Sequence, residues 1–321
     1  MFFSIPQALS MSLFGIPMFG VDTCGFNGNT DEELCNRWMQ LSAFFPFYRN
    51  HNTIYALAQE PYNWASVAEA TKTAMNIRYS LLPYMYTLFN SAHLTGSAVM
   101  RALAWEFPDE PQPAAADRQF LLGPSLLVTP VLEPGADSVS GVFPGASEGT
   151  IWYDWYNQSA ISDSMALSGA NVSIPAPLGH IPVFVRGGSV LPMQPLQDAL
   201  TIRDAQTHPW ALLIGLDANG AATGSLYLDD GENAKPNATL NVDMTVAQGC
   251  LYATETGAYA NANPLSNVTI MGVAETPGNV TLNGVAVKSF TYTAGSQLLQ
   301  VTGLETVTGK GAWSQDWQLD W

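Results

Sequence analysis

Two aromatic-rich runs, separated by a helical stretch, constrain the fold of this chain more than any other feature. The runs finish in Gly20–Phe26 and in Phe47–Asn52, and the strands themselves are expected at Ile16–Val21 and Phe45–Arg49. Each run starts apolar, as a buried strand does, and ends in polar or aromatic side chains. Because parallel strands joined by helices carry their last residues to one edge, the pattern predicts two consecutive strand ends of a (β/α)₈ barrel.

Helices are predicted around these strands. Ser4–Phe14 has a helical pattern, and a capping box at Thr30–Glu33 predicts a helix with a buried stripe of Leu34, Trp38 and Leu41. A second capping box at Ser66–Glu69 predicts a long helix that runs to about His93. Within that helix Pro83 is expected to cause a kink, and Gly96 is a candidate C-cap.

From about residue 120 the sequence changes to short β-rich runs separated by turn residues, a pattern typical of antiparallel sandwiches. Asn219-Gly220 predicts a hairpin with Ser225–Leu228 as the returning strand. The predicted fold is therefore α/β plus all-β. It comprises the C-terminal part of a (β/α)₈ barrel at residues 1–105, a proximal β-sandwich domain at 106–195 and a distal β-sandwich domain at 196–321.

Charge and hydropathy exclude two classes of partner. The formal net charge is −16 and only 12% of residues are charged, so a phosphate backbone would be repelled and no nucleic-acid binding is expected. Residues 1–21 carry no charge, which is compatible with a signal peptide or a membrane span. The absence of a basic leader and the polar and proline interruptions favour the interior of a barrel, so no membrane partner is expected.

The segments Gly20–Phe26, Arg37–Gln40 and Phe47–Asn52 together resemble glycoside hydrolase family 31, the α-glucosidases and their relatives. Later segments resemble the strands that follow the barrel in that family: Gly123–Pro130, Trp152–Tyr156, Ile181–Gly188 and Leu226–Glu232. The resemblance implies a retaining α-glucosidase that releases terminal α-linked glucose from oligosaccharides such as maltose, with glucose transfer as a further reaction. Two carboxylates are sufficient for this chemistry, so no cofactor and no metal are expected.

A pair of catalytic carboxylates is not evident in the sequence. Retaining hydrolysis needs two of them about 5 Å apart, and Asp22 is the only acid at a predicted strand end. The acids of Asp31–Glu33 begin a helix, and those of Asp229–Glu232 lie in a turn, where solvation is favoured over a calcium site. In the family the nucleophile and the acid/base precede the segments matched here. We therefore expect no catalytic residue in this chain, and an N-terminal chain of the same enzyme as its partner.

The resemblance to family 31 implies that residues of this chain contact the substrate. His51 matches a histidine that hydrogen-bonds glucose hydroxyls, and Phe26 matches a ring beside the same sugar. Asp22 lies in the same segment and is expected either to bind sugar or to hold an arginine. Arg49 is expected to orient its neighbours. The alternative for His51 and Phe26 is a purely structural role in the core.

Cysteines and sequons point to a secreted glycoprotein. Cys24 and Cys35 are expected to form a disulfide, with metal ligation as the less supported alternative, and Cys250 is expected to be free. N-glycosylation sequons are more frequent than the roughly one or two expected by chance, and their acceptors, all predicted to be at the surface, are Asn157, Asn171, Asn237, Asn267 and Asn279.

Two other functions fit parts of the sequence. A non-catalytic carbohydrate-binding or structural β-sandwich protein would explain residues 120–321, but not the polar and aromatic residues at the two strand ends. A family 31 enzyme with another sugar specificity, an α-xylosidase or α-galactosidase, would explain both.

Overall fold

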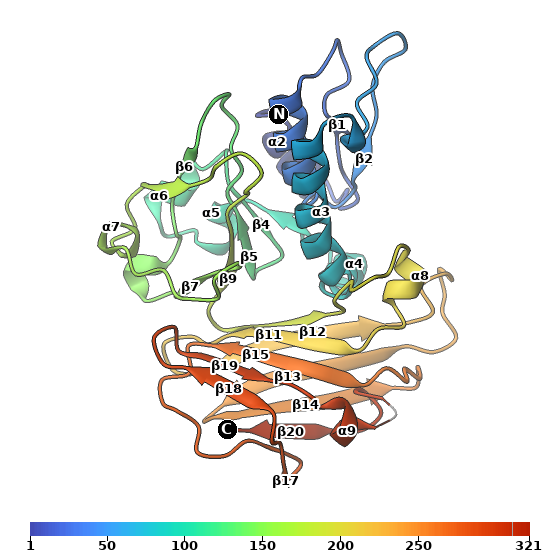
Figure 1. The fold of residues 1–321 in the computed structure, drawn as a ribbon, viewed down its shortest axis with the longest axis vertical. Helices are drawn as coiled ribbons and strands as arrows, with labels where there is room; N and C mark the ends of the chain where they lie inside the picture. The colour runs from blue at the N-terminus through green and yellow to red at the C-terminus, as the bar shows by residue number, and fades with distance from the viewer. Residues whose placement is uncertain (310) are drawn as a thin grey trace. The chain divides into compact units, whose positions relative to one another are not determined.

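A computed structural model describes residues 1–309 and 311–321 of the chain (Figure 1). These residues form two compact units. Unit 1 consists of Met1–Arg78, Ser91–Thr150 and Ile161–Phe184. Unit 2 consists of Tyr79–Asn90, Ile151–Ala160 and Val185–Trp321. The predicted domain boundaries after residues 105 and 195 stay a prediction.

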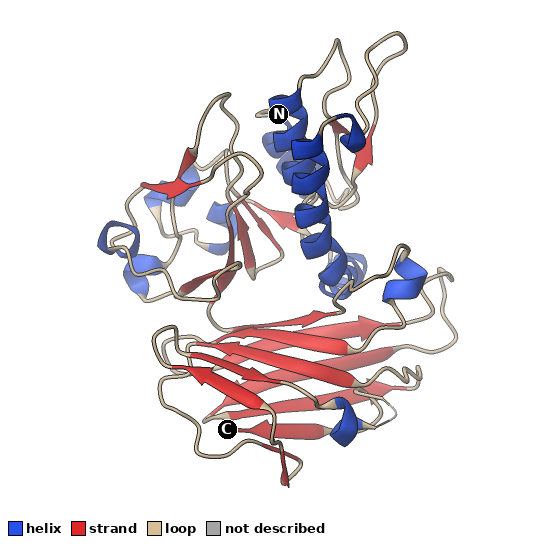
Figure 2. Ribbon diagram, viewed as in Figure 1, coloured by secondary structure: helices blue, strands red, loops and turns tan. Residues whose placement is uncertain are grey.

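The beginning of unit 1 is a strand–helix–strand arrangement (Figure 2). Its elements are α1 (Ser4–Leu13), β1 (Asp22–Thr23), α2 (Glu32–Ser42) and β2 (Arg49–Asn50). β1 and β2 are parallel, as the two aromatic-rich runs predict for neighbouring strands of an α/β barrel. The predicted strand positions are wrong by a few residues. Among the described residues β1 pairs only with β2, and the regular ladder is confined to the last residues of the two predicted strands and the residues that follow them.

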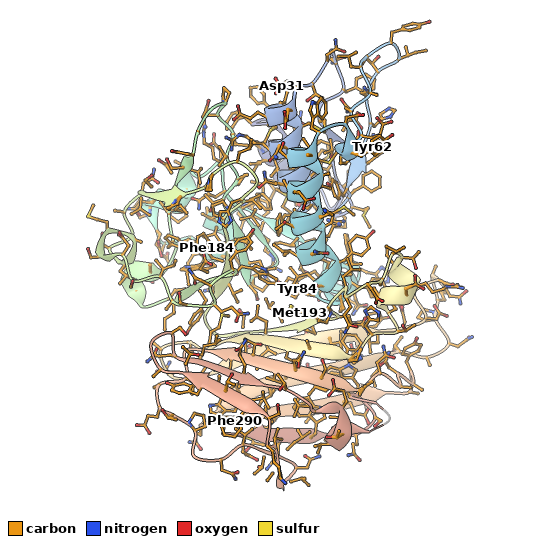
Figure 3. The ribbon with its side chains drawn as sticks, viewed as in Figure 1. Asp31, Tyr62, Tyr84, Phe184, Met193 and Phe290 are labelled. Carbon is orange, nitrogen blue, oxygen red and sulfur yellow. A yellow bond between two sulfur atoms is a disulfide. The ribbon has the colours of Figure 1, made fainter. Side chains whose placement is uncertain are left out.

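Helix α2 begins at an aspartate rather than at the threonine of the predicted capping box. The Asp31 side chain, labelled in Figure 3, accepts a hydrogen bond of 2.9 Å from the Leu34 amide and is the N-cap. Of the predicted buried stripe, Trp38 and Leu41 are buried. Leu34 is 37% exposed and the prediction for it is wrong, because Cys35 faces the core in its place.

The long helix predicted after Ser66 is two helices, α3 (Ala65–Ser80) and α4 (Leu82–Thr95), preceded by the short helix η1 (Pro61–Asn63). Pro83 lies in the first turn of α4, where a missing N–H costs nothing because those amides have no partner within the helix. The expected kink is therefore a break. Gly96 has a φ of +75° and its N–H bonds the Ala92 carbonyl at 2.9 Å, which confirms the predicted C-cap.

Short strands and helices follow in the middle of the chain. One sheet has the order β3-β4-β5-β9-β7, and β6 pairs antiparallel with β8. The strands are β3 (Met100–Arg101), β4 (Phe120–Leu122), β5 (Leu126–Val128), β6 (Ser138–Gly141), β7 (Trp152–Asp154), β8 (Val172–Pro175) and β9 (Val183–Arg186). The helices are α5 (Leu103–Glu106), α6 (Pro111–Ala114), η2 (Ala146–Glu148) and α7 (Ser164–Leu167).

An 11-stranded sheet dominates unit 2, in the order β17-β16-β20-β14-β13-β12-β10-β11-β15-β19-β18. One hydrophobic core includes Val190 of β10, Val242 of β13, Leu299 of β19 and Leu319 of β20. Because strands near both ends of the sheet contribute to a single core, the sheet is curled around it, and the two predicted sandwiches are not confirmed as such. Its strands are β10 (Ser189–Met193), β11 (Trp210–Gly215), β12 (Ala222–Leu228), β13 (Leu240–Ala247), β14 (Cys250–Gly257), β15 (Leu265–Met271), β16 (Thr281–Leu282), β17 (Val285–Ala286), β18 (Phe290–Thr293), β19 (Leu298–Val301) and β20 (Trp317–Asp320), with helices α8 (Ile202–Ala205) and α9 (Glu305–Thr308).

The turn at Asn219-Gly220 forms, but the predicted hairpin does not. The Gly220 amide bonds the Asp217 carbonyl at 3.0 Å, and Gly220 has a φ of +71°, which a glycine adopts without strain. β10 nevertheless lies between β11 and β12 in the sheet, antiparallel to the first and parallel to the second. A turn residue specifies the local backbone, whereas strand order depends on the segments that pack from elsewhere in the chain.

Candidate substrate-binding site

The predicted site residues follow two strands that approach each other closely. Asp22 is opposite Arg49, and Thr23 is opposite Asn50. Just before this ladder the Phe47 amide donates to the Phe19 carbonyl at 3.0 Å. The strands can run this close because residue 20 is glycine: a Cβ there would lie 2.0 Å from the Phe47 carbonyl oxygen. Phe26 and His51 thus leave the same end of the pair.

The aromatic ring of Phe26 and the imidazole of His51 are neighbours. Their centroids are 5.5 Å apart, with an angle of 36° between the ring planes. Both residues are exposed, and the Phe26 ring is not part of the core. The Thr53 amide donates to the Phe26 carbonyl at 3.1 Å and so ties the two loops together. An exposed ring beside a group that can donate and accept hydrogen bonds is suited to a sugar, which has C–H faces and hydroxyl edges.

Asp22 and Arg49 form an ion pair across the two strands. Asp22 is expected either to bind sugar or to hold an arginine, and its ion pair with Arg49 supports the second role. The Arg49 side chain is 52% exposed and that of Asp22 24%, so solvent screens the pair and it contributes little stability. Its geometric effect is to hold both side chains at the start of the loops that carry Phe26 and His51.

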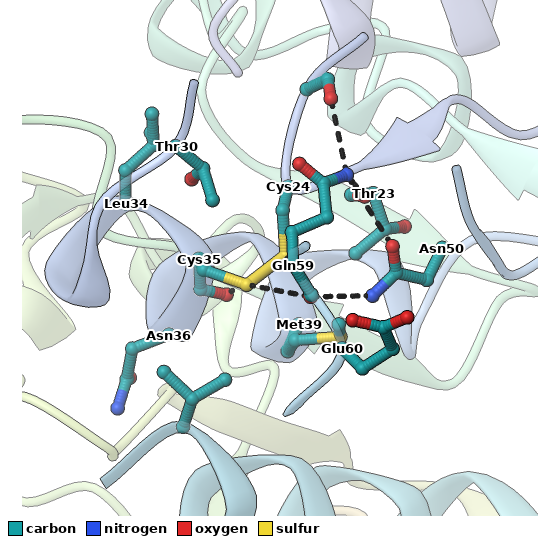
Figure 4. The surroundings of a disulfide bond; sticks show 12 residues. Thr23, Cys24, Thr30, Leu34, Cys35, Asn36, Met39, Asn50, Gln59 and Glu60 are labelled. Carbon is teal, nitrogen blue, oxygen red and sulfur yellow. Dashed lines mark hydrogen bonds between the residues drawn. A yellow bond between two sulfur atoms is a disulfide. The ribbon is translucent and has the colours of Figure 1, made fainter. Parts of the chain in front are cut away.

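The side chain of Gln59 joins the two loops, and no pattern in the sequence indicated it (Figure 4). Its buried amide Nε2 lies 2.9, 3.2 and 3.2 Å from the backbone carbonyls of Thr23, Gly25 and His51, which share its two N–H groups. It also approaches Asn50 Oδ1 at 3.3 Å, while Asn50 Nδ2 donates to the Gln59 carbonyl at 2.9 Å. An amide is the side chain that supplies donors without adding charge, so a single buried residue satisfies carbonyls from both strand ends.

The predicted disulfide between Cys24 and Cys35 is confirmed, and it fixes the loop after β1 to helix α2 (Figure 4). The two Cα atoms are 4.5 Å apart and both residues are buried, with Trp38, Met39 and Val67 in the same core cluster. Cys24 has a φ of +71°, in the left-handed region that residues other than glycine rarely adopt. Cys250 is free and buried, as predicted.

The acids at the start of α2 have structural partners. The Gly135 amide donates to Glu33 at 2.7 Å, and Arg37 donates to the same carboxylate at 2.8 Å. The Gly135 hydrogen bond, followed by the one from Arg37, holds the pKa of Glu33 below its usual value. Glu32 accepts from the Ser66 hydroxyl. Arg37 also donates to the Ala136 carbonyl at 2.6 Å, which gives this part of the family-like segment Arg37–Gln40 a structural role.

The acids of the turn after β12 are also engaged. Asp229 accepts from the hydroxyls of Tyr86 and Tyr227, and hydrogen bonds from Asn233 and the Glu232 amide keep the pKa of Asp230 low. Within residues 1–309 and 311–321, no three His, Cys, Asp or Glu side chains gather so that they could hold a metal ion. No helix in the same residues has both the length and the apolar character that crossing a bilayer requires.

The sequon asparagines are not equally placed. Asn157, Asn171, Asn237 and Asn279 are exposed and lie outside helices and strands, as predicted. Asn267 differs, because it lies within β15 and is half-buried. Glycosylation itself stays a prediction for all five.

Comparison with known proteins identifies the family. The model for the glycosyl hydrolases family 31 TIM-barrel domain matches residues 1–88, and that for the glycosyl hydrolase family 31 C-terminal domain matches residues 96–191. An alpha-glucosidase of Aspergillus oryzae is 63% identical over 100% of this chain, and one of Aspergillus niger is 60% identical. Both matches cover 32% of the relative, so the chain spans about a third of the length of these curated proteins.

The fold agrees with the sequence matches. A crystal structure of a glucosidase II alpha subunit superposes with a TM-score of 0.85 at 26% identity, over 99% of this chain and 36% of that one. The two family models together match more than half of the residues, and the matched part includes the strand ends at Asp22 and Arg49. The chain belongs to glycoside hydrolase family 31.

Proposed function

We propose that this chain is the C-terminal portion of a secreted, retaining α-glucosidase that releases terminal α-linked glucose from oligosaccharides such as maltose. The observation that carries the proposal is the pairing of Phe26 with His51 at two neighbouring parallel strand ends, with ring centroids 5.5 Å apart. Relatives that are 60–63% identical over the whole chain bear the name alpha-glucosidase, which supports glucose as the sugar.

In this proposal the chain binds the sugar that is attacked and does not carry the reacting groups. His51 hydrogen-bonds vicinal hydroxyls, and Phe26 packs on pyranose C–H groups. The reaction itself needs two carboxylates about 5 Å apart, one as nucleophile and one as acid/base. Asp22, at these strand ends, is bound to Arg49. We therefore assign both reacting carboxylates to an N-terminal polypeptide of the same enzyme.

An exposed apolar surface supports such a partner. Large apolar side chains near the start of unit 1 are exposed to an extent unusual for a soluble domain. They include Phe3, Leu13, Phe14, Ile16, Met18, Ile54, Tyr55 and Leu57, with exposures of 49% to 96%. Strands β1 and β2 pair with no third strand among the described residues, so their outer edges are open to further strands of a barrel.

Substitution of His51 tests the binding role. In the enzyme assembled from this chain and the upstream polypeptide, His51→Ala is expected to lose about 2–4 kcal/mol of transition-state stabilisation, a roughly 30- to 1,000-fold lower kcat/KM, because a buried sugar hydroxyl loses its partner. His93→Ala changes an exposed histidine at the end of α4 and serves as the control. If His51→Ala and the His93→Ala control have the same kcat/KM, the proposed role of His51 in binding the sugar is contradicted.

The sugar class is tested with a matched set of substrates. Aryl α-glucoside, α-xyloside and α-galactoside differ in the groups around one pyranose ring, so their kcat/KM values compare the three candidate specificities directly. We expect the α-glucoside to be preferred, with glucose released in the α configuration. Binding of oligosaccharide without hydrolysis of any of the three by the assembled protein would favour the non-catalytic alternative instead.

A further inference from the structure

A polar groove of about 450 Å³ lies on unit 2, over strands β15, β19 and β18. Its size is in the range of about 300–1,000 Å³ that sites for small molecules have. Six of the residues that line it are Asn267, Thr269, Lys288, Phe290, Thr291 and Gln300. Apart from Lys288 and Phe290 these are neutral amides and hydroxyls, a composition that suits an uncharged, hydroxyl-rich ligand.

The register of the sheet forms the floor of this groove. On β15 the side chains of Val268 and Ile270 are fully buried, so the alternating residues Asn267 and Thr269 face the opposite side. Thr269 is opposite Gln300 on β19, and Gln300 is opposite Thr291 on β18. A row of polar side chains therefore crosses three strands on the groove side. Phe290, labelled in Figure 3, lies at the start of β18, opposite the buried Val301, and packs on the hydrophobic core from the other face of the sheet.

Asn267 and Thr269 are also the two functional residues of an N-glycosylation sequon, Asn267-Val268-Thr269. This sequon differs from the other four in position. Its asparagine lies within a strand and is half-buried, whereas the other acceptors are exposed and outside regular elements. The acceptor amide is thus inside the groove, and a sugar attached to it would begin there.

We propose that Asn267 carries an N-linked glycan whose first N-acetylglucosamine residues lie in this groove. Asn267 Nδ2 displaces a lipid-linked diphosphate from C1 of the donor oligosaccharide: the N–C bond forms, the C–O bond to the diphosphate breaks, and the amide nitrogen loses a proton. Once in place, the sugar hydroxyls and acetamide hydrogen-bond the side chains of Thr269, Thr291 and Gln300.

The proposed position gives the glycan a structural role. β18 is the last strand in the sheet order, so its outer edge has no partner among the described residues. Exposed edges invite pairing with another chain, and natural proteins cover or charge them. A glycan seated from β15 to β18 covers the approach to this edge. The inference concerns folding and association, and it does not depend on the proposed α-glucosidase activity.

Site-resolved glycan release tests the proposal on the unaltered protein. The full chain is secreted from a eukaryotic host together with the upstream polypeptide, and glycopeptides are quantified by mass spectrometry during peptide-N-glycosidase treatment under native conditions. We expect Asn267 to be occupied and its glycan to be released about tenfold more slowly than that of exposed Asn279, the ratio that about 1.4 kcal/mol of contacts produces. After denaturation both should be released at the same rate. An unmodified Asn267 beside an occupied Asn279, or equal native release rates, would overturn the proposal.

Variants add a second readout. Asn267→Gln removes the glycan and is expected to lower Tm by about 2–4 °C, the shift that about 1 kcal/mol produces. Thr269→Ser keeps the sequon and should keep both the glycan and the Tm, while Asn279→Gln removes an exposed glycan and should leave Tm unchanged. Equal Tm values for Asn267→Gln and Asn279→Gln would contradict a glycan packed in the groove. If Asn267→Gln does not fold, the native release rates of the unaltered protein decide.

Discussion

At the scale of single residues, the geometry of the candidate site depends on the buried side chain of Gln59. Gln59 is 3% exposed, and its amide bonds the backbone carbonyls of Thr23, Gly25 and His51. These carbonyls belong to the loops that follow β1 and β2. Without Gln59 they would lose this donor, and the loss costs up to about 1–3 kcal/mol for a buried group such as the Thr23 carbonyl. Gln59 is thus a positioning residue for Phe26 and His51.

Replacement of the Gln59 amide by a carboxylate should disturb both stability and sugar binding. Gln59→Glu keeps the shape but removes the donors, so we expect it to lower the free energy of unfolding by roughly 2–4 kcal/mol and to raise KM more than it lowers kcat. Gln248→Glu makes the same change at an exposed position of the turn between β13 and β14 and should have no effect. Denaturant unfolding and steady-state kinetics of the assembled enzyme measure the two effects. A Gln59→Glu protein with an unchanged KM would leave Gln59 with a structural role alone.

At the scale of elements, α4 is fastened to the large sheet of unit 2 through a shared aspartate. Tyr86 on α4 donates to Asp229 Oδ1 at 2.8 Å, and Tyr227 at the end of β12 donates to Asp229 Oδ2 at 3.0 Å. The Tyr227 amide also donates to the Thr87 hydroxyl at 2.9 Å. Burial, and then the hydrogen bond to Asp229, raise the pKa of Tyr227 to about 12 and push that of Tyr86 upward as well.

Alkaline pH should therefore loosen this contact. In the unfolded chain a tyrosine ionises near a pH of about 10, whereas folded Tyr227 keeps its proton until pH 12 or so. The stability that depends on the protonated phenol is fully present below the pKa of the unfolded tyrosine. It is lost as pH rises through the pKa of folded Tyr227. Tyrosinate absorbance should show a late-titrating group that disappears in Tyr227→Phe. Tyr62→Phe, at an exposed position, is the control and should leave the late-titrating group in place.

The disulfide is the second device at this scale, because it fixes the first site loop to α2. Cys24 and Cys35 are 11 positions apart in the sequence, and in the chain-entropy model closing a loop of about this length stabilises the folded state by roughly 2–3 kcal/mol. Cys35→Ser should lower the free energy of unfolding by that amount and reduce sugar affinity, since Phe26 follows Cys24 in the loop. Peptide mapping without reduction checks the pairing. Recovery of Cys250 in a crosslink with Cys24 or Cys35 would contradict the pairing. Such a crosslink is not expected, because burial raises the pKa of the Cys250 thiol to about 11 and so disfavours the reactive thiolate.

The elements also show what sequence reasoning could and could not predict. Local signals predict α1, the Gly96 cap and the two neighbouring parallel strand ends, whereas the family resemblance predicts that Phe26 and His51 lie beside the same sugar. Sequence patterns did not predict the strand order of the large sheet or the exposure of Leu34, because both depend on contacts with other segments of the chain. Asn219-Gly220 forms its turn, yet β10 separates the two strands, and Leu34 is exposed because the Cys35 disulfide orients α2. Gln59 was missed because a buried glutamine has no periodicity or spacing that distinguishes it from an exposed one.

At the scale of the whole molecule, the feature that most needs an explanation is the set of large apolar side chains that unit 1 exposes. Phe3, Leu13 and Phe14 are 68% to 78% exposed, and Tyr55 is 96% exposed. Scattered apolar residues are ordinary at a surface, but several within one short stretch of chain mark a contact with another protein surface. In the proposed enzyme the upstream polypeptide covers them while it completes the barrel, which predicts an obligate and largely apolar interface well above about 2,000 Å².

Expression of residues 1–321 with and without the upstream polypeptide tests this arrangement. We expect no glucose release from maltose by the chain alone, and activity together with co-purification when both polypeptides are present. Phe14→Asp should weaken assembly at least about tenfold, because the lost burial of a phenylalanine side chain is worth about 1.5–3 kcal/mol and the new carboxylate must be desolvated. Leu200→Asp, at a position 92% exposed in unit 2, is the matched control and should assemble normally. Full activity from the isolated chain would overturn the two-polypeptide proposal, because a catalytic pair of carboxylates would then have to lie among the acids to which structural roles are assigned.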